Sequence, residues 1–216
     1  YVYSAVMSST AEWIEDEVHR TTGWPEWIDP GAASRYAAKY LFTGIEATVP
    51  AACALMRWMK AATAECAKRG PMLWFTPTGF PVWHDYRECD DHRVRVQSCG
   101  AMRCTIREYS DTIDKIRSKN AVSPNFVHSL DGSHVTGTVL RMKALGLSMV
   151  AIHDSFGTHP CDVGAMHSEI RTAFVDMYKD NSILGNFIWS LGVPCEQPMR
   201  GTMQIEAVHE SWAFFS

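Results

Sequence analysis

The chain has 216 residues, of which 46% are hydrophobic and 20% are charged, and its formal net charge is −4. These values are typical of a globular protein with a sizeable core, exclude a disordered chain, and confine any nucleic-acid site to a local patch. Seven cysteines without a C-x-x-C pair predict reduced thiols in a cytosolic protein, and no apolar run approaches the roughly 20 residues of a membrane span. Because the chain starts at Tyr1, we expect it to be the C-terminal piece of a longer polypeptide.

Helical patterns dominate the first 70 residues. Spaced apolar residues and a cluster of acids predict an amphipathic helix over residues 1–20, and an alanine-rich stretch predicts helix from Ala32 to Lys68. Proline removes a backbone hydrogen bond from a helix interior, so we expect two helices or one kinked helix, with the break at Val49-Pro50.

Two β-hairpins are predicted next. Met72 to Trp83 has two apolar runs around a Pro/Gly turn, which is typical of a hairpin. Farther on, Arg93 to Val96 alternates polar and apolar residues, and Met102 to Ile106 is a second possible strand. These strands and their flanks carry arginines that would make one basic hairpin: Arg93, Arg95, Arg103 and Arg107. A solvated antiparallel ribbon without a ligand explains the same pattern.

A charged residue at the tip of an apolar hairpin is the most unusual local feature. The run from Leu147 to Ile152 is β-prone and too short for a helix, so it predicts a strand. Gly157 and Pro160 then confine a second short run within a few residues, which requires a sharp turn and places Asp154 at its tip. A charge there is costly unless it is solvated, paired or bound to a cation. A turn aspartate and a metal-binding or catalytic aspartate both fit this position.

The remaining segments are predicted as follows. A turn at Ser123-Pro124-Asn125 precedes an amphipathic helix that ends near Ala144. Asp162 caps a helix that runs to about Lys179, and residues 180–200 are irregular. The apolar C-terminus, from Trp212 to Ser216, is expected to pack against the body of the protein.

Several well-known catalytic motifs are absent. The chain has no G-x-S-x-G, no Gly-rich phosphate loop and no H-E-x-x-H, and its histidines do not pair with cysteines at zinc-ligand spacing. The pair His153-Asp154 is compatible with a His-Asp metal phosphohydrolase, but those enzymes carry the pair on a helix. Here the pair follows a strand, which argues against that class.

Two segments taken together resemble a known family. Pro124 to His134 reads P-N-F-V-H-S-L-D-G-S-H, and about twenty residues later His153 to Thr158 reads H-D-S-F-G-T. In that order and at that spacing, they resemble the C-terminal part of the single-subunit DNA-dependent RNA polymerases of bacteriophages and mitochondria. Thr76 to Val82 and the ending Glu210 to Ser216 are similar to this family as well, and weaker similarity reaches Val2-Tyr3.

The resemblance implies a role for each matching residue. Asp154 would be the second of two metal-binding aspartates that together hold two Mg²⁺ ions for nucleotidyl transfer. His153 would position the primer terminus or the hairpin, and His128 would lie near the nascent base pair; a structural role is the alternative for both. Tyr3 would match the tyrosine that discriminates the ribose 2′-hydroxyl, although the family has Tyr-Gly where this chain has Tyr3-Ser4.

The basic hairpin falls where the family places its promoter specificity loop. Arginines suit guanine edges in a major groove and phosphates elsewhere, so Arg93 and Arg95 are candidates for base contacts. Asp131 and His134 are expected to serve local packing and hydrogen bonding.

The predicted fold is α+β and mostly helical, an incomplete, family-A-like right hand. Residues 1–70 would be fingers-side helices, residues 71–120 a hairpin and the specificity loop, and residues 121–216 the palm with its metal-binding hairpin and tail. The first metal aspartate and the triphosphate-binding residues lie upstream in the family, so we expect this chain to need that part, as the same or a separate polypeptide. Its other partners would be promoter and template DNA, RNA and NTPs, in the cytoplasm of an infected bacterium.

Two other functions stay open at this point. The chain could be a non-catalytic nucleic-acid-binding remnant in which the motif residues survive as structure. It could also be the palm of a family-A DNA polymerase, although those enzymes usually place Glu after His-Asp, where this chain has Ser155.

Overall fold

The computed structural model describes residues 6–96, 102–153, 155–179, 182–192, 196, 198 and 201–214. Helices predominate, and the strands form three separate two-stranded antiparallel sheets, in agreement with the predicted α+β class. The helices are α1 (Met7–Arg20), α2 (Pro30–Thr48), α3 (Pro50–Cys66), α4 (Lys115–Ala144), α5 (Val163–Tyr178) and α6 (Ser182–Leu191), with 3-10 helices η1 (Pro160–Asp162) and η2 (Ile205–Glu210). The sheets pair β1 (Met72–Phe75) with β2 (Pro81–His84), β3 (Arg87–Val96) with β4 (Met102–Ile113), and β5 (Val150–Ile152) with β6 (Ser155–Gly157).

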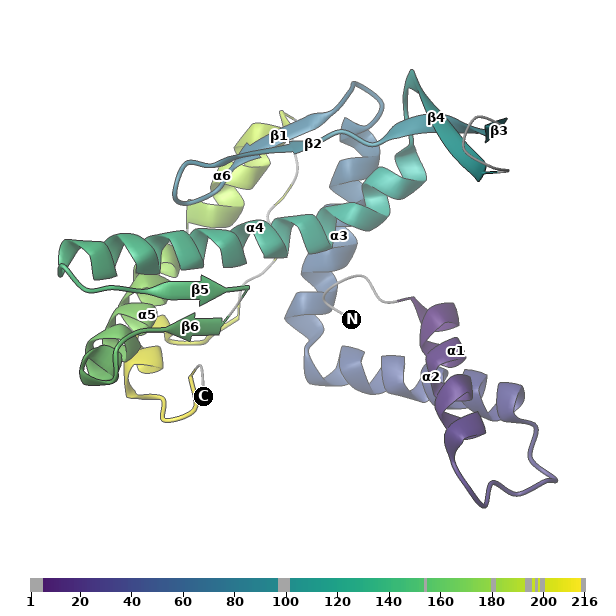
Figure 1. The fold of residues 1–216 in the computed structure, drawn as a ribbon, viewed down its shortest axis with the longest axis horizontal. Coiled ribbons are helices and arrows are strands. Elements are labelled where there is room, and N and C mark those ends of the chain that lie inside the picture. The colour runs from purple at the N-terminus through teal and green to yellow at the C-terminus, as the bar shows by residue number, and fades with distance from the viewer. Residues whose placement is uncertain are drawn as a thin grey trace.

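The first three helices form a projecting arm. Figure 1 shows α1 lying along α2 at one end of the molecule, while α3 runs from α2 into the body. Pro30 and Pro50 both occupy first helical positions, where the missing N–H costs nothing, and Asp29 accepts a 2.7 Å hydrogen bond from the N–H of Ala32. The predicted break at Val49-Pro50 is therefore confirmed.

Helix α4 is the central element, and it corrects one prediction. It has 30 residues and begins at Lys115, where Asp114 accepts a 2.9 Å hydrogen bond from the N–H of Arg117. The predicted turn at Ser123-Pro124-Asn125 is wrong, because Pro124 lies inside this helix. An internal proline costs about 3 kcal/mol. Burial of Val122 and Phe126 on either side of it offsets that cost.

The hydrophobic core lies where α3, α4, α6 and β1 meet. Trp74 of β1 is 1% exposed, and its ring contacts Phe126 of α4 and Phe187 of α6 at centroid distances of 6.2 and 5.4 Å. The other buried members of this cluster are Met59, Ala62, Cys66, Met72, Val122, Leu130 and Leu191. Aromatic and methionine side chains from four separate elements thus fill one core.

The structure also corrects the predictions for the C-terminal third. Residues 182–191 form helix α6 and are not irregular, because Phe187 and Leu191 on one face enter the core. Asp162 occupies the N-cap position of α5, but its side chain makes no capping hydrogen bond. The strand expected from Leu147 begins only at Val150.

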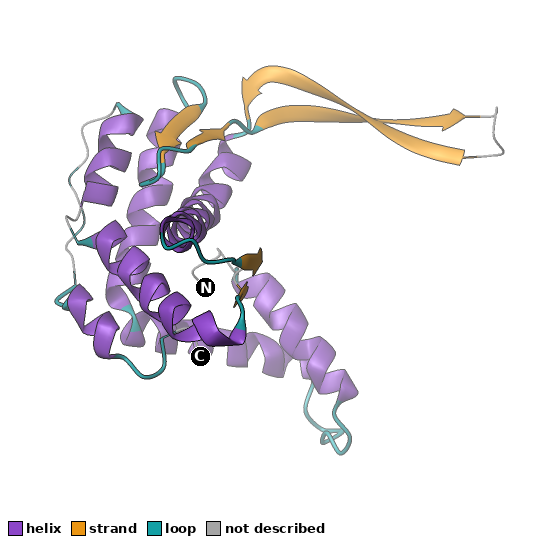
Figure 2. Ribbon diagram, turned by 60° about the vertical axis from the view of Figure 1, so that its left-hand side comes forward, coloured by secondary structure: helices purple, strands orange, loops and turns teal. Residues whose placement is uncertain are grey.

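The hairpin of β3 and β4 forms a long ribbon. Figure 2 shows it projecting away from the helical body, with its root beside β2 and the start of α4. Both strands are longer than predicted, yet the paired segments include Arg93–Val96 and Met102–Ile106 as expected. None of the helices in the part of the chain described above is long and apolar enough to cross a membrane.

Candidate functional site

The β5–β6 hairpin is the first part of the candidate site. Its register pairs Val150 with Gly157 and Ile152 with Ser155, so only His153 and Asp154 connect the strands. His153 adopts a left-handed backbone conformation with φ of 55°, which a two-residue hairpin turn requires. Asp154 lies outside the described residues. The sharp turn inferred from the sequence is confirmed, and Ile152, His153 and Ser155 around it are exposed.

Aromatic and hydrogen-bond contacts hold this hairpin against α4 and α5. The ring of Phe156 in β6 meets the ring of His134 edge to face, with centroids 6.1 Å apart. His134 is 5% exposed, and its Nε2 lies 2.8 Å from the carbonyl oxygen of Ile170, so Nε2 carries the proton and donates it. The prediction that His134 serves packing and hydrogen bonding is confirmed, and its ring fixes the hairpin relative to both helices.

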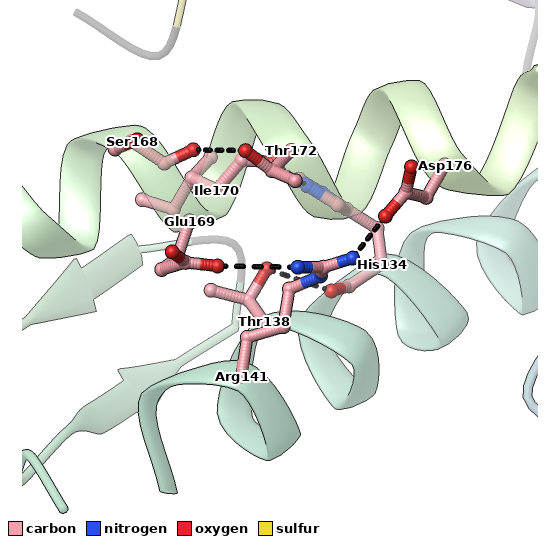
Figure 3. Close-up of polar contacts among 8 residues, drawn as sticks. All are labelled: His134, Thr138, Arg141, Ser168, Glu169, Ile170, Thr172 and Asp176. Carbon is pink, nitrogen blue, oxygen red and sulfur yellow. Dashed lines mark hydrogen bonds and ion pairs between the residues drawn. The ribbon is translucent and has the colours of Figure 1, made fainter. Parts of the chain in front are cut away.

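Polar contacts along the α4–α5 interface support that arrangement. Figure 3 shows the guanidinium of Arg141 in α4 between two carboxylates of α5, those of Glu169 and Asp176. The contact with Glu169 is 3.3 Å. On the same side of α4, Thr138 donates a 2.9 Å hydrogen bond to the carbonyl oxygen of His134. These contacts restrict sliding of α5, and with it the movement of the hairpin.

The C-terminal segment packs back on α5, as the sequence predicted for its aromatic residues. Phe214 contacts the ring of Phe174 at a centroid distance of 5.0 Å, and the guanidinium of Arg171 lies 5.7 Å from the Phe214 ring. Arg171 is 3% exposed and donates hydrogen bonds to the carbonyl oxygens of Val208, at 3.2 Å, and Ser211. By contrast Trp212 is 92% exposed, and the last two residues lie outside the described ranges.

His128 lies on an exposed face of α4 beside a groove of about 740 Å³. Its Nδ1 is 3.9 Å from a carboxylate oxygen of Asp131. The opposite wall of the groove includes Thr78 and Phe80 of the turn between β1 and β2, and Pro81 at the start of β2. A histidine in this position is available to a ligand in the groove and is not needed to fill the core.

Two serines of the same helix hold the β1–β2 hairpin. Ser129 accepts a 3.2 Å hydrogen bond from Nε1 of Trp74, and Ser133 accepts a 3.1 Å bond from the backbone N–H of Thr78. Each bond joins residues that are 55 positions apart. Sequence reasoning missed both serines as anchors, although they lie in one motif segment and Thr78 lies in another.

The four predicted arginines share one face of the β3–β4 ribbon. Paired residues of an antiparallel ladder point to the same side, and successive residues alternate. The pairs Arg93↔Thr105, Arg95↔Arg103 and Asp91↔Arg107 are therefore on one side, with like charges directly opposite near the tip. Only nearer the root does a carboxylate join this face, where Arg107 Nε lies 3.2 Å from Asp91. The predicted hairpin is confirmed, and it carries the four arginines on one face.

A polar network fixes the root of the ribbon, and sequence reasoning missed it. His84 is 2% exposed and donates from Nε2 to the carbonyl oxygen of Ser118 at 3.0 Å, which leaves Nδ1 to accept from the side-chain amide of Asn125 at 3.2 Å. The same amide nitrogen lies 3.0 Å from the hydroxyl of Tyr86. Burial lowers the pKa of His84, against smaller opposing effects of the Ser118 hydrogen bond and the charge of Asp85. The neutral ring that this network requires is therefore favoured.

The predicted metal site is not assembled from the described residues alone. In those ranges no three His, Cys, Asp or Glu side chains gather into a group that could hold a metal ion. Tyr3, the predicted ribose discriminator, lies outside the described residues, as Asp154 does. Among the described residues, five cysteines form no disulfide bond: Cys53, Cys66, Cys89, Cys104 and Cys161.

Comparison with known proteins covers most of the chain. The sequence pattern of a family described as DNA-dependent RNA polymerase matches residues 1–192. The DNA-directed RNA polymerase of Pseudomonas phage phiKMV is 37% identical over 192 residues, which is 88% of this chain and 24% of that protein. T7 RNA polymerase of Escherichia phage T7 is 35% identical over 179 residues, which is 74% of this chain and 20% of that protein. A mitochondrial DNA-directed RNA polymerase of Nicotiana tabacum, 1B, is 37% identical over 196 residues, or 86% of this chain and 19% of that protein. The chain thus spans about a quarter or less of the length of these relatives.

Proposed function

This chain belongs to the DNA-dependent RNA polymerase family, and we propose that it is the C-terminal part of a single-subunit enzyme of the phage type. The complete enzyme transfers nucleotides from NTPs to the 3′ end of RNA on a DNA template, in the cytoplasm of an infected bacterium. Residues 1–70 form fingers-side helices, residues 71–120 carry the promoter specificity loop, and residues 121–216 form the palm of a right hand. The observation that carries this proposal is the anchored β5–β6 hairpin, with His153 and Asp154 as its two-residue turn.

The chemistry of this turn fits one ligand of a magnesium site. A carboxylate is the hard oxygen donor that Mg²⁺ prefers. Ile152, His153 and Ser155, the described residues next to Asp154 in the chain, are exposed. One carboxylate cannot hold two ions, so Asp154 would supply one ligand and an aspartate of the upstream part of the enzyme another. When bound, the two ions would activate the RNA 3′-hydroxyl and stabilise the leaving pyrophosphate.

Exposed apolar residues on the hairpin support an upstream partner. Val150 and Ile152 are 57% and 65% exposed, although they belong to a strand beside the candidate site. Burying a side chain of this type stabilises a protein by about 1.5–3 kcal/mol. The relatives are at least four times longer than the matched segment. The upstream part of the polymerase, in the same or a separate polypeptide, would therefore bury Val150 and Ile152.

The remaining site residues receive roles in nucleic-acid binding. His128, beside the groove, contacts the sugar edge of the nascent base pair, and His153 positions the primer terminus or the hairpin. Tyr3 discriminates the ribose 2′-hydroxyl. The arginine face of the ribbon, which presents Arg95 and Arg103 side by side, contacts promoter DNA; like charges this close are stabilised by phosphates or by guanine edges.

The test is Asp154→Asn in the complete polymerase, which combines this chain with its upstream part. Asparagine keeps the size of the side chain and removes the charge, so single-nucleotide extension of an RNA primer with Mg²⁺ should fall by at least about 10³-fold. Binding of the same primer–template, measured by fluorescence anisotropy, should be unchanged. Asp16→Asn, at an exposed position of α1, is the matched control and should extend at the wild-type rate.

Two outcomes would contradict the proposal. Normal extension by the Asp154→Asn enzyme would favour a non-catalytic nucleic-acid-binding remnant. Preferential incorporation of dNTPs over rNTPs by the unaltered enzyme would favour a DNA polymerase palm.

A further inference from the structure

Because the ribbon is long, a small rotation at its root moves its tip, and anything bound there, by a much larger distance. Strand β3 has 10 residues, which at about 3.3 Å each extend roughly 30 Å from the root. Rotation of the root by about 5° would therefore move the tip by roughly 3 Å, which is the length of a hydrogen bond. Figure 2 shows that the ribbon projects from the body, so its direction depends on the contacts at its root.

Contacts among residues 85–87 and 111–114, at the root of the ribbon, hold β3 and β4 together. The backbone N–H of Asp114 donates to the carbonyl oxygen of Tyr86 at 2.9 Å, just below the strands. Arg87 donates to the carbonyl oxygen of Asp111 at 2.6 Å and pairs with the carboxylate of Asp85 at 2.5 Å. The bond from Arg87 to Asp111 joins the two strands, and the pair with Asp85 holds Arg87 to the segment before β3. None of these contacts involves the helical body.

Contacts from α4 set the angle between the ribbon and the helical body, and they converge on two neighbouring positions. His84 and Tyr86 flank the point where the chain leaves β2 and enters β3. Both lie within hydrogen-bond distance of one amide nitrogen, that of Asn125, and Arg117 at the start of α4 lies 5.5 Å from the Tyr86 ring. The side chain of Asn125 therefore joins the last residue of β2 and the residue before β3 to α4, beside the hydrogen bond from His84 to the carbonyl oxygen of Ser118.

The same helix carries His128 one turn farther on, beside the groove. Any change in the angle between α4 and the ribbon thus changes the distance between a DNA contact at the arginine face and the site near His128. We propose that Asn125 is a positioning residue that holds the ribbon at a fixed angle to α4 and thereby places promoter DNA in register with the active site. This inference rests on the proposed function of the ribbon as a promoter contact.

The experiment compares two activities of the complete polymerase. The first is initiation on promoter DNA, measured as KM for the promoter and as kcat. The second is extension of a preassembled RNA–DNA scaffold without a promoter, which does not use the ribbon. Asn125→Leu removes both hydrogen bonds and keeps the number and branching of the side-chain heavy atoms, and Tyr86→Phe removes one of the bonds. Asn120→Leu makes the same change at an exposed position of α4 and serves as the control.

The expected result is a graded rise in KM for the promoter. Asn125→Leu should raise it about tenfold and Tyr86→Phe about threefold, while scaffold extension stays within about twofold of the unaltered enzyme. An equal fall in both activities would show that Asn125 only supports the fold, and would overturn the inference. Unchanged activities would overturn it as well.

A second pair of variants separates this inference from its premise. Arg95→Ala and Arg103→Ala should also raise KM for the promoter without affecting scaffold extension. If they do so and Asn125→Leu does not, the positioning role of Asn125 fails alone. If the arginine variants leave KM unchanged, the ribbon is not the promoter contact, and the proposed function of the ribbon and the role of Asn125 both fail.

Discussion

Gly157 has no room for a side chain, and this offers a sensitive test of the hairpin. A Cβ atom at Gly157 would lie 2.9 Å from Cγ1 of Val150, its cross-strand partner. Carbon atoms pack best at about 3.5–4.0 Å, so Gly157→Ala requires the strands to separate or Val150 to turn by roughly 0.6–1 Å. Overpacking of this size costs about 1–3 kcal/mol, and the low end applies to this chain alone, in which Val150 is exposed and can adjust.

The effect on catalysis should exceed the effect on stability. Each strand of the hairpin has only 3 residues, so a shift at Gly157 reaches the turn that contains Asp154. Misplacement of a catalytic group by about 1 Å can cost about 10²-fold in rate, and we expect a loss of that order in primer extension by the complete polymerase. Val150→Ala removes the opposing methyl group, so the double variant should recover most of the rate, while Val150→Ala alone should change it little. Full activity of Gly157→Ala, or no recovery in the double variant, would refute this reasoning.

Three further predictions concern stability. Burial lowers the pKa of His84 below 6.5. The neutral His84 ring therefore contributes fully to the unfolding free energy above about pH 6.5, and this contribution declines as the pH falls below that value. His84→Gln should reduce the dependence of the unfolding free energy on pH, measured by urea titrations at several pH values. Arg171→Met removes the hydrogen bonds to Val208 and Ser211 and should lower the unfolding free energy by about 2–4 kcal/mol while exposing the C-terminal segment to proteases. Pro124→Ala restores an N–H inside α4 and should raise the unfolding free energy by about 1–3 kcal/mol in the same titrations; a decrease would mean that contacts of the proline ring outweigh the missing bond.

Local patterns in the sequence were sufficient for the elements whose stability is mainly local. The amphipathic and alanine-rich segments, the break at Pro50 and the alternating arginines predicted α1 to α3 and the ribbon. The turn predicted at Pro124 is wrong, because the cost of a proline is visible locally whereas the burial of Val122 and Phe126 depends on the tertiary fold. Helix α6 likewise depends on the burial of Phe187 and Leu191, which no local pattern shows.

The site shows a similar division. The resemblance of two motif segments identified the hairpin that carries Asp154 and the helix that carries His128, and the tight turn and the exposed histidine agree with it. The contacts that support the site could not be predicted, because they join residues far apart in the sequence. Asn125 and His84, for example, are 41 positions apart. A usable signal did exist, since the residues in two of these contacts, Thr78 and Ser133, belong to two segments that match the same family. The roles of Tyr3 and Asp154 stay predictions.

The motif on α4 combines buried and half-buried polar anchors with an exposed histidine. Asn125, Ser129 and Ser133 follow each other at intervals of four residues, which places their side chains on one stripe of the helix. Ser118, which precedes the motif, contributes its backbone carbonyl oxygen. Through this stripe α4 holds the ribbon root and the β1–β2 hairpin. His134 lies on another face and holds the β5–β6 hairpin. Three hairpins are thus positioned by one rigid helix, and they keep their mutual geometry only while α4 stays continuous. The role of His128 toward a substrate stays a prediction. Four of the six polar residues of the motif, Asn125, Ser129, Ser133 and His134, make these contacts, whereas the side chain of His128 is exposed.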